Sequence, residues 1–115
     1  MKKLLVLFSA LILALVLTAS ANAAEVALTS IGQSSDAMMV RVLMKSLGIS
    51  SDYDAVMKPD ALTGQKVLIA VVGGSSKGLG AAGINKDDEI KRGDAVFKAA
   101  QEKKMNIIVM HVGGE

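Results

Sequence analysis

The chain has 115 residues, of which 13 are basic and 11 acidic, and it contains no cysteine. Without cysteine it can hold neither a disulfide framework nor a thiolate metal site, nor a lipid-modified cysteine at a cleavage point. A short chain buries only about 60–65% of its unfolded surface, so we expect one domain with one modest aliphatic core.

The first 23 residues have the pattern of a secretory signal peptide. Lys2 and Lys3 form a positive start, a mostly apolar run follows from residue 4 to residue 17, and Ala21-Asn22-Ala23 fits a cleavage site. The apolar run is shorter than the roughly 20 residues that a transmembrane helix needs. We therefore expect an exported protein, periplasmic or extracellular, with a single α/β domain over residues 24–115.

Removal of this segment also removes two positive charges. Lys2 and Lys3 leave with it, and residues 24–115 then carry 11 basic and 11 acidic side chains. Such a balance offers no basic surface to nucleic acid or to a membrane, and Tyr53 and Phe97 are too few aromatic residues for base stacking. We expect no nucleic-acid partner and no membrane association after cleavage.

The expected domain begins with a buried strand, Val26–Ile31, which ends at a glycine. Ser34 or Ser35 then caps a helix that runs to about Leu47 and has an aspartate in its first turn, where a negative charge favours the helix dipole. Helical spacing predicts a buried face made of Met39, Val40, Leu43 and Leu47.

Two further strands are expected before the glycine-rich segment. Tyr53–Met57 is the weaker one, and its charged flanks place it at an edge of the sheet. Pro59 opens a single helical turn after it. Val67–Val72 is apolar throughout, as in a strand that is covered on both faces.

The glycine-rich segment, residues 73–83, is expected to be a loop because glycine is a poor helix former. Asn85 caps the helix that follows, with acidic residues in its first turn and Lys103 and Lys104 in its last. Its predicted buried stripe consists of Ile90, Gly93, Phe97 and Ala100. Ile107–Met110 forms the final strand.

The alternation of strands and helices predicts a three-layer α/β fold with parallel strands and right-handed crossovers. We expect a four-stranded sheet in the order 2-1-3-4, which is flavodoxin-like or Rossmann-like. The sequence stops at Glu115, directly after the fourth strand, so we expect the domain to lack a closing helix. Either the reading frame is truncated, or a second copy or another partner covers the open face of the sheet.

The spacing of Gly74, Gly78 and Gly80 resembles the phosphate loop of short-chain dehydrogenases. However, it follows the third strand instead of the first, and the helix signals begin only at Asn85. Tyr53 lacks the lysine four residues later that completes the catalytic pair of those enzymes. An exported protein also meets little nicotinamide cofactor. We therefore expect no nucleotide cofactor.

A second pattern, Gly74–Gly78, matches the nucleophile elbow of α/β-hydrolases. Ser76 stands as the nucleophile, and Asp94 and His111 follow in the hydrolase order. The elbow requires a helix directly after the serine, which residues 77–83 do not favour. About 90 residues are also too few for that fold. We therefore expect no hydrolase triad.

The carboxyl edge of the sheet is the expected ligand site. In the order 2-1-3-4 the loops after the first and third strands flank the point where the strand order reverses, and open α/β sheets bind ligands there. Backbone amides of a glycine-rich loop can form an anion-binding nest, to which Lys77 adds a positive charge. The predicted ligand-binding residues are Gln33, Ser34, Ser35, Gly74, Ser75, Ser76, Lys77, Gly78, His111 and Glu115. The alternative is that the glycines only allow a tight connection.

Metal binding is not expected. His111 is the only histidine, and near it in the sequence only the carboxylate of Glu115 offers a second ligand. The methionines at positions 38, 39, 44, 57, 105 and 110 suggest a copper site in an exported protein. Their spacing fits a core instead, where methionine fills irregular gaps.

One protein family resembles this chain in three segments: TSIGQSSDAMMVRVL, VLIAVVGGSSKGLGAAGI and IIVMHVGGE. It consists of small exported bacterial α/β proteins known only as a domain of unknown function, and the resemblance covers about residues 26–115. The resemblance implies the α/β architecture and export, and it offers no assigned activity whose catalytic residues could be carried over. Members of the family continue past the segment that matches His111 to Glu115, which implies a C-terminal truncation here.

Three functions remain open at this point. The first is a non-enzymatic exported module that binds a small anion with the glycine-rich loop. The second is an enzyme of unknown, for example hydrolytic, reaction with His111 as the general base. The third is an envelope protein whose open sheet face contacts a partner.

Overall fold

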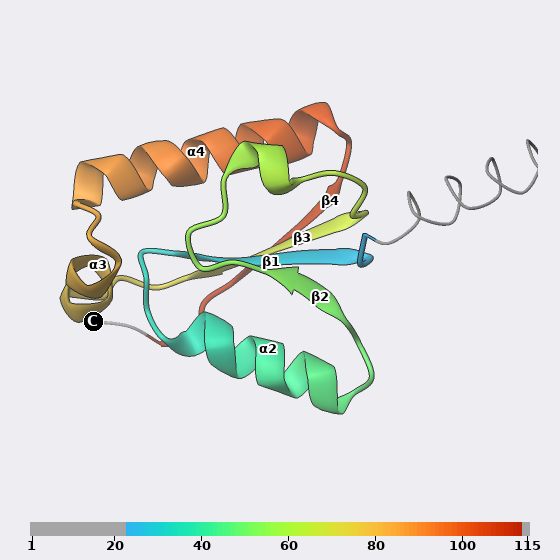
Figure 1. The fold of residues 1–115 in the computed structure, drawn as a ribbon, viewed down its shortest axis with the longest axis horizontal. Coiled ribbons are helices and arrows are strands. Elements are labelled where there is room, and N and C mark those ends of the chain that lie inside the picture. Colours follow the sequence, from blue (N-terminus) through green and yellow to red (C-terminus); the bar gives the residue numbers. More distant parts are fainter. Residues whose placement is uncertain (1–22, 114–115) are drawn as a thin grey trace, which may run out of the picture.

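A computed structural model of the chain describes residues 23–113, and Figure 1 labels its elements. Residues 1–22 of the predicted signal peptide and Glu115 therefore lie outside the described residues. Four parallel strands form one sheet in the order β2-β1-β3-β4, which confirms the predicted order. The strands are β1 (Val26–Ile31), β2 (Ser51–Tyr53), β3 (Val67–Val72) and β4 (Asn106–Met110).

The helices lie on both faces of the sheet and beyond its carboxyl edge. In Figure 1, α2 (Asp36–Ser46) lies on one face, and α4 (Lys86–Glu102) lies on the other with the short turn η1 (Pro59–Ala61). The short helix α3 (Ser76–Ala82) lies at the end of the sheet. The fold is thus the predicted three-layer α/β arrangement. In the described part of the chain, no helix has the length and apolar character needed to cross a membrane.

The two central strands, β1 and β3, have the predicted bounds and form the middle of the core. Successive residues of a strand point to opposite faces of the sheet. Leu28 and Val71 accordingly pack on the α2 side, while Ala27 and Leu68 pack on the α4 side, and all four are fully buried. Burial on both faces explains why β3 is apolar throughout and why β1 is apolar except at Thr29 and Ser30, which are themselves buried.

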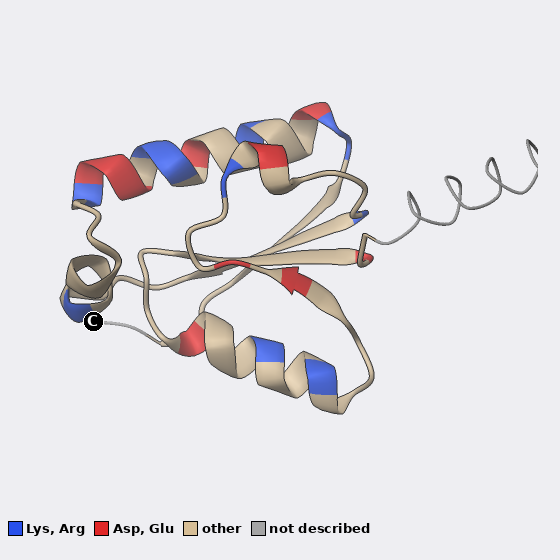
Figure 2. Ribbon diagram, in the orientation of Figure 1, with Lys and Arg blue, Asp and Glu red and all other residues tan. Residues whose placement is uncertain are grey.

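The helix α2 is rotated relative to the prediction, so most of its predicted buried face is exposed. The buried residues of this helix are Ala37, Val40 and Met44. Met39, Leu43 and Leu47, which were expected in the core, are 55%, 57% and 76% exposed. Apolar residues surround most of this helix, so periodicity alone does not identify the face that contacts the sheet. Figure 2 accordingly shows few charged residues on α2.

The predicted buried stripe of α4 is wrong at two positions. Glu89 is buried in place of its neighbour Ile90, which is 54% exposed. Val96 is fully buried, whereas Phe97 is only partly buried. The other two predicted positions, Gly93 and Ala100, are buried. An apolar pattern cannot place Glu89 in the core, because a carboxylate is buried only where charged or polar partners compensate it.

The bounds of other elements also differ from those predicted, and β4 begins one residue earlier, at Asn106. β2 lies at an edge of the sheet as expected, but it covers Ser51–Tyr53 instead of residues 53–57. The Asp54 side chain accepts a hydrogen bond of 2.9 Å from the backbone N–H of Val56, which turns the chain away from the sheet. The helix α4 ends at Glu102, so Lys103 and Lys104 follow its last turn.

The glycine-rich segment contains a helix, contrary to prediction. The Ser75 side chain caps α3 by accepting a 3.0 Å hydrogen bond from the N–H of Gly78, and Gly83 ends the helix in a left-handed conformation (φ 69°). These caps offset the low helix propensity of glycine. Because a helix does follow Ser75, the expected lack of a helix at this position no longer argues against a dehydrogenase or a hydrolase. The position of the glycine pattern after the third strand and the lack of a lysine four residues after Tyr53 still argue against a dehydrogenase.

Candidate ligand-binding site

Backbone hydrogen bonds join the loops that follow β1 and β3. The N–H of Ser34 donates to the carbonyl of Gly73, and the N–H of Ser75 donates to the carbonyl of Gly32, both at 3.0 Å. The two predicted loops therefore lie together at the carboxyl edge of the sheet. Their backbones fill the space between them, so any cavity at this edge lies to one side of the joined loops.

Gln33 helps to hold the joined loops in place. It has a left-handed backbone (φ 66°) directly after Gly32 (φ 98°), so the positive φ values of this edge occur in the first loop and not at Gly73–Gly80. Its side-chain amide donates hydrogen bonds of 2.8 Å to the carbonyl of Ala55 and to Oε2 of Glu89. These two bonds use both N–H groups of the amide, which assigns Gln33 a positioning role.

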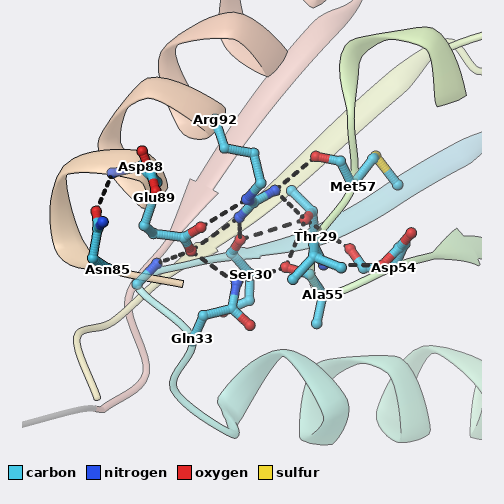
Figure 3. Close-up of polar contacts among 12 residues, drawn as sticks. Thr29, Ser30, Gln33, Asp54, Ala55, Met57, Asn85, Asp88, Glu89 and Arg92 are labelled. Atoms are coloured by element: carbon cyan, nitrogen blue, oxygen red, sulfur yellow. Dashed lines mark hydrogen bonds and ion pairs between the residues drawn. The ribbon is translucent and has the colours of Figure 1, made fainter. Parts of the chain in front are cut away.

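The carboxylate of Glu89 lies at the centre of a buried polar network (Figure 3). Its Oε2 accepts hydrogen bonds from the N–H of Gly32 at 2.8 Å and from Arg92 at 3.0 Å, while its Oε1 accepts another from Arg92 at 2.7 Å. Arg92 also donates to the carbonyls of Met57 and Ser30. The Arg92 and Glu89 side chains are only 10% and 4% exposed. The network thus fastens α4 to the loops after β1 and β2.

The charge state of Glu89 follows from two opposing effects. Burial alone would raise the pKa of its carboxyl group. Hydrogen bonds from Arg92, Gln33 and the N–H of Gly32, together with the charge of Arg92, outweigh burial and hold this pKa below its ordinary value. Glu89 is therefore a carboxylate at neutral pH, and its charge is balanced by Arg92.

A cavity of about 360 Å³ lies beside this network, between α3, the start of α4 and the ends of β1 and β3. Its apolar lining consists of Ile31, Val72, Leu79 and Ile90. Its polar lining consists of Ser75, Ser76, Lys86 and Glu89, and Gly32 and Gly74 complete the wall. We call this space the edge cavity. Its position agrees with the expected ligand site of an open α/β sheet.

The structure brings some of the predicted residues to the edge cavity and places others around it. Gly74, Ser75 and Ser76 line it. Ser35 and Lys77 are exposed and are not lining residues. The lysine of the lining is Lys86, which was not among the predicted ligand-binding residues. Its place at the first residue of a capped helix, directly after the glycine-rich segment, was the available signal.

Two other predicted residues support the walls. The Ser34 hydroxyl lies 3.1 Å from a carboxylate oxygen of Asp36 and donates to it. Gly78 lies so close to Gln33 that a Cβ on Gly78 would collide with the Gln33 carbonyl oxygen. A glycine is therefore required where α3 crosses the loop after β1.

His111 lies at the same edge of the sheet, after β4. Its Nδ1 is 2.7 Å from the carbonyl oxygen of Val72. Because a carbonyl only accepts, Nδ1 carries the proton and Nε2 of the neutral ring can act as a base or ligand. Between residues 23 and 113, no group of three or more His, Asp or Glu side chains is arranged to hold a metal ion.

A larger hollow of about 600 Å³ lies beside β2. Its polar lining includes Asp52, Asp54 and Gln65. It shares no lining residue with the edge cavity and does not touch the loops after β1 and β3. Size alone would favour this hollow as the ligand site, whereas position in the fold favours the edge cavity. We give more weight to position.

Neither a curated protein nor a solved structure matches this chain. A family model does match, over residues 23–115, and its description is that of a domain of unknown function, DUF6305. The match agrees with the resemblance that the three sequence segments showed. The chain therefore belongs to the DUF6305 family.

Proposed function

We propose that this protein binds a small organic anion with a compact apolar body in the edge cavity. The observation that carries the proposal is the composition of the wall. Apolar side chains from both central strands and from α3 and α4 surround a space whose polar lining includes Lys86, Ser75 and Ser76. Small-molecule sites typically have this composition and a volume of about 300–1,000 Å³.

The charges around the edge cavity favour an anion over a cation. Glu89 is the acidic residue of the lining, and its carboxylate is already compensated by Arg92 and by the N–H groups of Gly32 and Gln33. Lys86 is exposed at the first residue of α4, where the positive end of the helix dipole also favours negative charge. The resulting ligand class is a short branched or cyclic carboxylate or phosphate ester.

The place of action proposed here is outside the cytoplasm. The signal-peptide pattern of residues 1–23 supports it. The proposed protein is a small exported binding module, without catalysis of its own.

Thermal unfolding in the presence of a panel of anions tests the proposal. The panel contains acetate, isobutyrate, benzoate, inorganic phosphate and phenyl phosphate. A ligand present at about 100 times its Kd adds roughly 2.7 kcal/mol, which raises the Tm of a domain of this size by several degrees. We expect such a shift for an anion with an apolar body. Lys86→Gln should remove most of it, whereas Lys77→Gln, which changes an exposed lysine of α3, should retain it. A panel without any shift contradicts the proposal.

An enzymatic role stays a prediction, and one contact favours it. The hydrogen bond from His111 Nδ1 to Val72 orients the imidazole ring and leaves Nε2 able to accept a proton. This second candidate function predicts that a carboxylic ester or amide is turned over by the wild-type chain. His111→Ala should abolish that turnover and leave the Tm within about 2 °C of the wild type, as expected for an exposed side chain.

A further inference from the structure

The amino end of the described chain contacts β2 through a fixed carboxylate. The backbone N–H of Ala24 donates a hydrogen bond to Oδ2 of Asp52 at 3.1 Å. The same oxygen accepts a bond of 2.8 Å from the amide of Gln65, which is only 6% exposed. Oε1 of Gln65 in turn accepts hydrogen bonds from the N–H groups of Thr63 and Gly64, at 2.9 and 3.2 Å. The position of the carboxylate is thus set independently of Ala24.

The residue after Ala24 is also held in place. The backbone carbonyl of Glu25 accepts hydrogen bonds from the N–H groups of Lys66 and Val67, at 2.9 and 3.1 Å. The Glu25 side chain lies 3.7 Å from the ammonium group of Lys66, so these two nearby charges are paired with each other. Ala23, in contrast, is exposed. The chain is therefore fastened from Ala24 onward and accessible just before it.

The bond that the sequence predicts to be cleaved, Ala23–Ala24, contains the nitrogen that binds Asp52. Its hydrolysis by a signal-peptide-cleaving protease consumes one water molecule and leaves a carboxylate on Ala23 and an ammonium group on Ala24. An amide offers one N–H group and no charge, whereas an ammonium group offers three N–H groups and a positive charge. The hydrogen bond from an amide to a carboxylate is already charge-assisted through its acceptor, and a positive charge on the donor adds a direct Coulombic attraction to it.

We infer that Asp52 binds the mature amino terminus of this protein, so that cleavage after Ala23 replaces a hydrogen bond from an uncharged amide by an ion pair. The inference rests on the predicted signal peptide and not on the edge cavity. The occupant is the chain's own α-ammonium group, bound beside the hollow that Ala23, Asp52 and Gln65 line. In the mature protein, the ion pair fastens the amino terminus to the short edge strand β2.

Export of the full chain from a bacterial host, followed by amine labelling, tests the inference. The exported product is first identified by intact mass and N-terminal sequencing. Its α-amine is then allowed to react with a limiting amount of an acetylating reagent, and the N-terminal peptide is quantified by mass spectrometry over time. Asp52→Asn removes the charge with little change in shape. Asp54→Asn is the matched control, because Asp54 is exposed and its contact with the N–H of Val56 needs only an acceptor oxygen.

We expect a product that begins at Ala24. Its α-amine should react about two- to fivefold more slowly in the wild type and in Asp54→Asn than in Asp52→Asn, as for a partly exposed ion pair. If Asp52→Asn does not fold, a glycine inserted between Ala23 and Ala24 replaces it, because the insertion moves the amine by about 3.8 Å. This variant should show the same acceleration.

Three results would overturn the inference. They are a product with another amino terminus, equal rates in the wild type and in both test variants, and equal acceleration by Asp52→Asn and Asp54→Asn. None of them affects the edge cavity, with which the hollow beside β2 shares no lining residue.

Discussion

At the scale of single residues, Glu89 connects three segments of the chain. It accepts hydrogen bonds from the loop after β1 and is paired with Arg92, which donates to the carbonyl of Met57 in the segment after β2. Loss of its carboxylate leaves a buried guanidinium group without a counter-charge. Breaking a buried pair in this way costs about 3–5 kcal/mol.

We therefore expect Glu89→Leu to lower the free energy of unfolding by about 3–5 kcal/mol, measured by urea denaturation. Asp87→Asn is the matched control, since Asp87 is an exposed acidic residue in the same turn of α4. Its cost should stay below about 1 kcal/mol, the size of a helix-dipole effect. Similar costs for both variants would contradict the role given to Glu89.

The same residue predicts a pH dependence of stability. The pKa of Glu89 is lower in the folded protein than its ordinary value. A group with a lowered folded pKa stabilises the protein above its unfolded pKa, about 4.3 for glutamate, and this contribution is lost as the pH falls further. Between about pH 5 and pH 3, the free energy of unfolding should fall more steeply in the wild type than in Glu89→Gln. Parallel curves would show that Glu89 contributes no such stabilisation.

Two glycines of α3 predict opposite effects of the same substitution. A Cβ on Gly78 would collide with the backbone carbonyl of Gln33, whereas a Cβ on Gly80 would meet no atom within 4 Å. Gly78→Ala should therefore destabilise by about 1–3 kcal/mol through overpacking. Gly80→Ala should stabilise by roughly 0.5–1 kcal/mol, because alanine has the higher helix propensity. Urea denaturation of both variants measures the difference, and a stabilising Gly78→Ala would contradict the packing of α3 against the loop.

At the scale of elements, α2 shows what its sequence pattern can and cannot determine. The existence of the helix, its start after Ser35 and its C-terminal glycine were predictable from the sequence. The predicted serine cap was wrong, because the Ser35 side chain makes no capping hydrogen bond and the Ser34 hydroxyl donates to Asp36. The rotation of the helix was not predictable, because both candidate faces are apolar. The choice between them depends on how the loop at Gly32 and Gln33 directs the chain, and those backbone angles have no apolar signature.

The rotation of α2 leads to a direct prediction. Met44 is 9% exposed and Leu43 is 57% exposed, although the sequence pattern placed Leu43 in the core. Met44→Ala should lower the free energy of unfolding by about 2–5 kcal/mol. Leu43→Ala should change it by no more than about 0.5 kcal/mol, as is usual for a surface position. A larger loss of unfolding free energy in Leu43→Ala than in Met44→Ala would instead support the buried face predicted from periodicity.

The candidate site, like the buried face of α2, was only partly predictable from the sequence. The rule for open α/β sheets, applied to the order 2-1-3-4, correctly brings Gly74, Ser75 and Ser76 to the carboxyl edge. The rule does not identify Lys86 and Ile90, because they belong to α4, and the rotation of α4 decides which of its side chains face α3. The Glu89–Arg92 spacing of three residues is visible in the sequence, but the partners of this pair lie up to 63 residues away. Such long-range polar contacts follow from the fold and not from local spacing.

At the scale of the whole molecule, charged side chains are distributed unevenly over the elements. Figure 2 shows acidic and basic residues along α4, and few on α2 and on the strands. Apolar side chains are exposed on α2 and on β4, where Ile108 and Val109 are 48% and 60% exposed. The proposed ligand site lies at the carboxyl edge, where the joined loops, α3 and α4 meet.

The measurement that tests the proposed site most directly is a ¹H–¹⁵N chemical-shift titration. The titrant is the anion of the panel that raises the Tm most. We predict saturable shifts that concentrate on the backbone amides of Gly32, Gly74, Ser75 and Leu79, and that largely disappear in Lys86→Gln. Shifts that concentrate on Asp52, Asp54 and Gln65, or that never saturate, would contradict ligand binding in the edge cavity.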